Sequence, residues 1–154
     1  MTEEEKKELS VMLGAAKIYN DSGVLLEDII CKILAPLVRE KGAELGGSII
    51  GSVILYALSC EIGLKSLYIK NGLQIPKKHD LKSLFEGLPE EVQNEIKTGL
   101  QDDNLNKEFD TLLVTNKDAF INWRYYYEGN QTVNIYFLRK LAPSIFLVGK
   151  KGIE

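Results

Sequence analysis

Residues 45–60 read LGGSIIGSVILYALSC, an uncharged stretch bounded by Glu44 and Glu61. It is shorter than the roughly 18–20 apolar residues that a bilayer-spanning helix requires. Its small residues, which lie between positions 46 and 52, allow another helix to approach closely. The sequence therefore predicts a central helix, from about Glu44 to Asn71, that is buried on most of its sides.

The chain before this helix predicts two separate helices. Apolar residues recur at spacings of three and four from about Glu3 to Tyr19, which is typical of an amphipathic helix. Residues 20–23 (NDSG) predict a turn, and the next helix should bend or break near Pro36 because proline lacks a backbone donor.

The chain after the central helix predicts four more helices, since caps, prolines and apolar spacings recur. We expect them at Asp80–Leu88, from Pro89 onward, from Asp103 or Asn104 to about Glu128, and at Val133–Val148 with a kink at Pro143. The predicted fold is all-α, a single compact bundle of five to seven helices that forms one domain over residues 1–154.

Composition and charge argue against a disordered chain and against a generally basic protein that binds nucleic acid over its whole surface. Hydrophobic residues make up 45% and charged residues 27%, which is ordinary for a globular domain. The net charge of −3 does not draw the whole chain toward nucleic acid or an anionic membrane. Cys31 and Cys60 lie in apolar surroundings and the acidic start lacks a signal-peptide pattern, so we expect reduced core cysteines and a cytoplasmic protein without membrane association.

The only histidine, His79, lies in a basic segment with Lys77, Lys78 and Asp80. The positive charge suits a phosphate group, although a solvated loop has the same composition. Asp80 can cap the following helix, or it can accept the proton of the His79 imidazole and so select its tautomer.

Near the end of the central helix, Glu61, Lys65 and Tyr68 share one face because they are four and three residues apart. Glutamate four residues before lysine stabilises a helix by about 0.2–0.5 kcal/mol through an ion pair. Because the preceding turns are predicted to be buried, the same side chains could instead line a pocket.

A second polar and aromatic cluster ends the predicted helix at Glu128. Arg124 and Glu128 are four residues apart, as are Trp123 and Tyr127, which is typical of a core stripe with a flanking ion pair. The three tyrosines at 125–127 cannot all face inward on a helix. An exposed tyrosine beside an arginine suits base stacking or a protein interface.

Three segments together resemble the helical HEPN superfamily (higher eukaryotes and prokaryotes nucleotide-binding): Ala57–Tyr68, His79–Leu81 and Phe120–Glu128. The resemblance covers about residues 50–130. It implies a compact α-helical bundle that often forms dimers and is frequently linked to RNA, nucleotides or prokaryotic conflict systems.

Ribonucleases of that superfamily carry an arginine followed four to six residues later by a histidine. Only Arg124 matches this motif, because no histidine follows it. We therefore expect binding of RNA, another nucleic acid or a nucleotide without catalysis, with Arg124 on phosphate and Lys77 and Lys78 adding charge. One alternative is a metal-independent ribonuclease that uses His79 and Arg124. Another is a protein-interaction or adaptor module.

The candidate site therefore contains two groups of residues, and we expect no metal or cofactor. The candidate catalytic residues are His79 and Arg124; the candidate ligand-binding residues are Glu61, Lys65, Tyr68, Lys77, Lys78, Asp80, Tyr127 and Glu128. We expect an ion pair between the helices that carry Glu61 and Arg124. We also expect a homodimer, because residues 46–52 and the final helix offer apolar surface.

Overall fold

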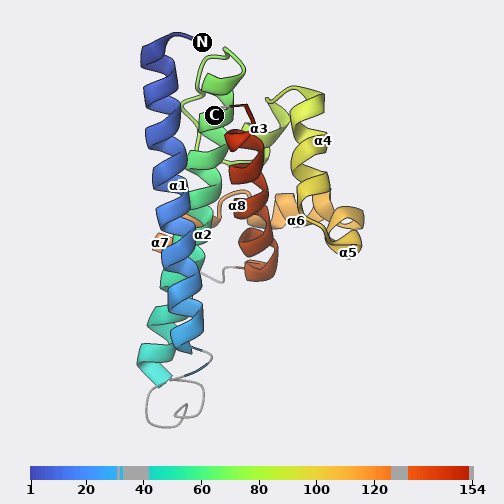
Figure 1. Ribbon diagram of the computed structural model, residues 1–154. Helices are drawn as coiled ribbons and strands as arrows, with labels where there is room; N and C mark the ends of the chain where they lie inside the picture. The colour runs from blue at the N-terminus through green and yellow to red at the C-terminus, as the bar shows by residue number, and fades with distance from the viewer. Residues whose placement is uncertain (31, 33–41, 126–131, 153–154) are drawn as a thin grey trace.

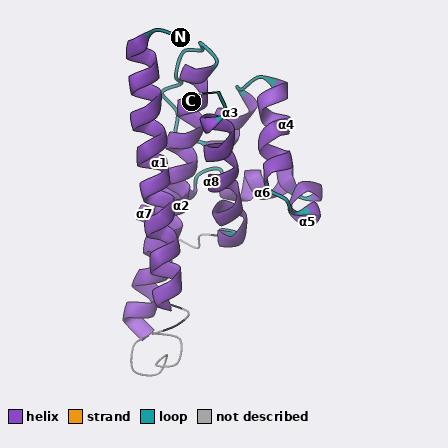
Figure 2. Cartoon of the chain, in the orientation of Figure 1, coloured by secondary structure: helices purple, strands orange, loops and turns teal. Residues whose placement is uncertain are grey.

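The computed structural model describes residues 1–30, 32, 42–125 and 132–152, and these form helices joined by loops, with no strand among them (Figure 2). The helices are α1 (Glu3–Ile29), α2 (Gly42–Lys70), α3 (Leu81–Glu86), α4 (Glu90–Gly99), α5 (Asp103–Lys107), α6 (Phe109–Asn116), α7 (Ala119–Arg124) and α8 (Ile135–Lys150). Five of these segments are eight residues long or longer. The predicted all-α class is confirmed.

The central helix is α2. It runs beside α1 over most of its length and also contacts α3, α7 and α8, while α4 packs on α8 (Figure 1). No residue from 50 to 70 is fully exposed. Within the described chain, Gly46–Lys70 is the segment long and apolar enough to cross a membrane by length and composition, and half of its most apolar window is buried. This burial fits the predicted core helix.

The predicted turn at residues 20–23 is wrong, because α1 continues without interruption to Ile29. The residues that favour a turn have helical partners instead. Asp21 pairs with Lys17 one turn earlier, and a Cβ atom at Gly23 would lie 3.0 Å from Cε1 of Tyr56. Gly23 thus allows α1 and α2 to approach closely, and this packing outweighs the local preference for a turn.

The predicted helix from Asp103 or Asn104 to Glu128 is divided into α5, α6 and α7. Its cap is Asp102, whose Oδ1 accepts bonds from the backbone of Asn104 and Leu105, each at 3.1 Å. The buried Asn116 ends α6. Its Oδ1 accepts a bond from Asn134 N at 2.9 Å, and this bond ties the end of α6 to the start of α8.

The last helix, α8, begins after the N-cap Asn134 and continues through Pro143. Its buried Ser144 donates a hydrogen bond of 2.6 Å to Ile96 O and so joins α8 to α4. Three aromatic rings, from α3, α6 and α8, pack together in the core. Phe109 lies 4.9 Å from Phe85 and 5.5 Å from Phe137, measured between ring centroids.

Candidate functional site

The candidate site is built on Glu61, a carboxylate that α2 holds in the interior. Only 4% of Glu61 is exposed. Its Oε1 accepts a hydrogen bond of 2.8 Å from Lys65 Nζ on the next turn and lies 2.8 Å from Nδ1 of His79. A buried carboxylate needs such partners, because an unpaired buried charge is costly.

The second oxygen of Glu61, Oε2, is buried and has no hydrogen-bond partner in the structure. Trp123 Nε1, on the neighbouring helix α7, also lacks an acceptor. Buried polar atoms without partners are uncommon in native proteins and require an explanation. Glu61 therefore retains an unused acceptor within a polar cluster.

The contact with Glu61 determines which ring nitrogen of His79 carries the proton in the neutral imidazole. The carboxylate accepts the Nδ1 proton, so in the neutral imidazole Nε2 carries a free lone pair. The His79 side chain is 52% exposed, so solvent and ligands reach the ring. This arrangement gives His79 one buried anchor and one accessible face.

Arg124 and His79 both lie close to the aromatic ring of Phe120. The guanidinium carbon of Arg124 lies 4.7 Å from the centroid of Phe120 and 5.4 Å from that of Tyr125. The Phe120 ring lies 6.5 Å from the imidazole of His79. Phe120 was not among the predicted site residues, although its spacing of four from Arg124 is a signal for contact on a helix.

The ion pair that we predicted between the helices of Glu61 and Arg124 is absent from the described chain. Glu61 pairs with Lys65 and His79 instead. Arg124 is exposed and stacks on aromatic rings, where a guanidinium keeps its hydration and gains cation–π attraction. Of the predicted residues, the structure thus brings Glu61, Lys65 and His79 into direct contact, and Arg124 lies near them through Phe120.

The basic segment contributes two exposed lysines, Lys77 and Lys78. Neither forms an ion pair with a described residue, whereas Lys82 pairs with Glu86. The neighbouring Asp80 is the N-cap of α3, and its Oδ1 accepts bonds from Lys82 N at 2.8 Å and Ser83 N at 3.1 Å.

Tyr68 lies in the core, where its hydroxyl donates a bond of 2.8 Å to Leu84 O. Burial raises the pKa of the Tyr68 phenol. Tyr127 and Glu128 lie outside the described residues. No group of three His, Cys, Asp or Glu side chains is placed to hold a metal ion within the part of the chain that the structure describes.

Comparison with known proteins identifies the family. The family model of the HEPN domain matches residues 52–130, which is just over half of the chain and includes Glu61, His79 and Arg124. No curated protein and no solved structure gives a match. The chain belongs to the HEPN domain family, which confirms the resemblance carried by its sequence.

Proposed function

We propose that this HEPN domain binds RNA without cleaving it, through the surface formed by Lys77, Lys78, His79, Phe120 and Arg124. The observation that carries the proposal is the exposed Arg124 guanidinium, which is supported by two aromatic rings and has no carboxylate partner in the described chain. A guanidinium in this setting is suited to bidentate phosphate contacts.

The rest of the surface supplies the two other features of a single-strand site. Lys77 and Lys78 add unpaired positive charge, and Tyr125, a residue 43% exposed, extends the surface beside Arg124 with a second aromatic ring. Positive charge that follows a backbone, together with aromatic rings that stack on bases, is the usual basis of sequence-tolerant binding. The charge of −3 belongs to the whole chain and leaves this patch locally basic.

The test is a binding titration with fluorescent single-stranded and hairpin RNA, in chelator, over a series of salt concentrations. Affinity should fall as salt rises, because phosphate contacts release counterions. Arg124→Ala should weaken binding and reduce the slope of log K against log salt by about 0.7 for each lost contact. Arg124→Lys, which keeps the charge but loses the planar fork, should fall between the wild type and Arg124→Ala.

The matched control is Lys107→Ala, which removes an exposed positive charge from α5, outside the surface. Its affinity should equal that of the wild type. An affinity that does not change with salt concentration, or that Arg124→Ala leaves unchanged, would overturn the proposal.

A second candidate, a metal-independent ribonuclease, is favoured by the contact between Glu61 and His79. A carboxylate that holds Nδ1 leaves Nε2 available as a general base. The same RNA incubations distinguish the two functions on a gel. Intact RNA supports binding alone, whereas cleavage that falls by about 10²–10⁴-fold in His79→Ala supports the ribonuclease. RNA that is neither bound nor cleaved supports an interaction module.

We also propose that two copies of the chain associate. Val11, Ile18 and Leu25 are 65%, 65% and 62% exposed and stand seven residues apart on α1. Such residues form one apolar line along the helix, opposite the face that packs on α2. In an antiparallel pair, Ile18 would lie on the two-fold axis and Val11 would face Leu25 of the partner.

A further inference from the structure

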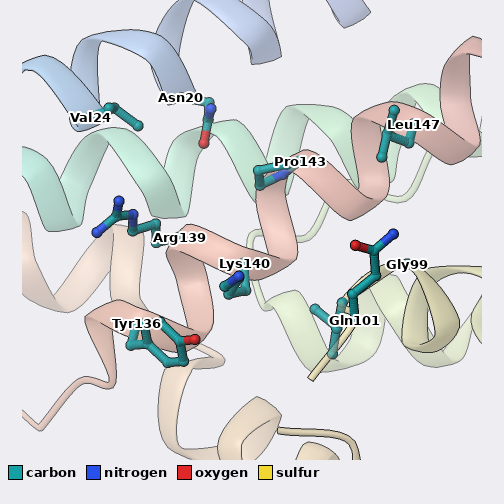
Figure 3. Close-up of a pocket in the computed structure, with 10 residues that line it drawn as sticks. Asn20, Val24, Gly99, Gln101, Tyr136, Arg139, Lys140, Pro143 and Leu147 are labelled. Carbon is teal, nitrogen blue, oxygen red and sulfur yellow. The ribbon is translucent and has the colours of Figure 1, made fainter. Parts of the chain in front are cut away.

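A groove of about 470 Å³ lies between α1, the connection from α4 to α5, and α8 (Figure 3). Its lining residues are Asn20, Val24, Gly99, Leu100, Gln101, Tyr136, Arg139, Lys140, Pro143 and Leu147. None of them belongs to the surface proposed for RNA. The volume falls within the range of about 300–1,000 Å³ that is usual for sites that hold small molecules.

One side of the groove is basic. Lys140 makes no ion pair within the described chain, and its Nζ lies 5.7 Å from the centroid of the Tyr136 ring. Arg139 uses only Nη1 for its bond of 3.0 Å to Glu27, so its other N–H groups have no partner in the described chain. Asp102, the N-cap of α5, accepts a bond of 3.1 Å from the Tyr136 hydroxyl, so this carboxylate already has donors.

The groove also contains an unused acceptor. The Oδ1 atom of Asn20 is buried and has no hydrogen-bond partner in the structure. Such an atom costs free energy in the folded protein unless a donor reaches it. Because Asn20 lines the groove, rotation of its side chain would bring Oδ1 within reach of a donor on a bound molecule.

The backbone at the groove is strained. Gln101 has φ of 52°, the only positive φ of a residue other than glycine in the described chain. Non-glycine residues rarely adopt this conformation, and such strain concentrates at binding and active sites. Gln101 directly follows Leu100, the C-cap of α4, and its side chain lies beside the groove in Figure 3.

The remaining wall is apolar. Val24 comes from α1, and Pro143 and Leu147 come from α8, with Leu147 still 56% exposed. A few polar groups that converge beside an apolar wall are the usual composition of a small-molecule site.

We infer that this groove binds a small organic anion: a planar or apolar body, placed against Val24, Pro143 and Leu147, that carries one phosphate or carboxylate group. The anion would contact Lys140 and the unpartnered N–H groups of Arg139. An N–H or O–H group of the body would donate to Asn20 Oδ1. This site is separate from the surface proposed for RNA, so each stands without the other.

The test is a titration of the isotope-labelled full chain, followed by amide shifts in NMR spectra, with phenyl phosphate and benzoate as anionic probes. Phenol and inorganic phosphate serve as probes that lack one half of the ligand. We expect millimolar phenyl phosphate or benzoate to shift residues 99–101 and 136–143. Phenol and inorganic phosphate should bind about tenfold more weakly, because each lacks one set of contacts.

The variant Lys140→Ala should raise the dissociation constant of the anionic probe about tenfold, the usual effect of losing one charge-assisted bond. Asn20→Leu, which keeps the shape of the side chain but removes the Oδ1 acceptor, should also raise the dissociation constant about tenfold. Lys7→Ala, an exposed change outside the groove, should have no effect. A response to phenyl phosphate alone or to benzoate alone identifies the anion. Shifts confined to other surfaces, equal binding of phenol, or an unchanged Lys140→Ala would overturn the inference.

Discussion

At the scale of single residues, Glu27 links three helices. Its Oε2 accepts a bond of 2.7 Å from the Tyr56 hydroxyl on α2, and its Oε1 accepts one of 3.0 Å from Arg139 on α8. Burial, and then the bond to the Glu27 carboxylate, raises the pKa of Tyr56. The fully buried Tyr56 therefore holds its proton more tightly in the folded chain than in the unfolded chain.

We predict that Tyr56→Phe lowers the free energy of unfolding by about 1.5–3 kcal/mol, because a hydrogen bond to a charged group is lost. Urea denaturation at neutral pH measures this change. Tyr19→Phe, whose hydroxyl bonds no described residue, is the control and should leave the midpoint unchanged.

The same variant has an expected pH dependence. A raised pKa in the folded state stabilises the protein fully below the unfolded value, about 10 for tyrosine, and this stability disappears as the pH rises through the folded value. The wild type should therefore lose stability above about pH 10 more steeply than Tyr56→Phe. Parallel slopes for the two proteins would contradict this assignment.

At the scale of elements, helix contacts in the bundle depend on small residues at particular positions. A Cβ atom at Gly63 of α2 would lie 2.8 Å from Cγ2 of Ile145 on α8. Gly47, on the same helix, is exposed and would meet nothing within 4 Å. Both glycines lie inside α2, but a Cβ atom at position 63 would collide with α8, whereas one at position 47 would face open space.

We predict that Gly63→Ala destabilises the protein by about 1–3 kcal/mol, because the added methyl group pushes α8 away from α2. Gly47→Ala is the matched control. It should stabilise the chain by about 0.5–1 kcal/mol, since alanine is the better residue inside an open helix. Thermal unfolding of the two variants measures both signs, and equal shifts would refute the packing argument.

At the scale of the whole molecule, the bundle leaves apolar side chains uncovered in one line on α1. The opposite face of α1 buries Leu9, Leu13 and Ala16. The exposed line thus adds apolar surface to a helix whose other side already packs in the bundle. An uncovered apolar line of this length is typical of an interaction surface.

We predict that the wild type is a dimer at micromolar concentration and that Ile18→Glu converts it to a monomer. The change would place two like charges at the centre of an isologous interface. Light scattering measures the mass. Val114→Glu, which places the same charge at an exposed apolar position on α6, should remain dimeric. A monomeric wild type, or a dimeric Ile18→Glu, would exclude this interface.

Local patterns in the sequence determined much of the fold. The apolar run identifies α2, because a helix that packs on several sides needs apolar residues around most of its circumference. Asp80 before α3 and Pro89 before α4 mark helix starts, since the first turn leaves backbone donors without partners. Glu61 and Lys65 were expected to pair, because a spacing of four places two side chains together on any helix.

Contacts between distant residues decided the rest. The continuous α1 depends on Gly23 against Tyr56, and the end of α6 depends on Asn116 bonding to Asn134, neither of which local spacing can indicate. The site follows the same rule. The sequence pointed to His79, its only histidine, and to Arg124 of the family motif, but only tertiary packing brings His79 to Glu61, 18 residues earlier in the chain.

The groove beside α8 depends most on the tertiary structure. Asn20, Gln101 and Lys140 come from three distant segments, and no motif in the sequence indicates that they line one groove. Sequence periodicity reports which face of each helix is apolar, because that property is local. Periodicity does not report which polar atoms lack hydrogen-bond partners after the helices pack. Whether an atom finds a partner depends on all the elements that surround it.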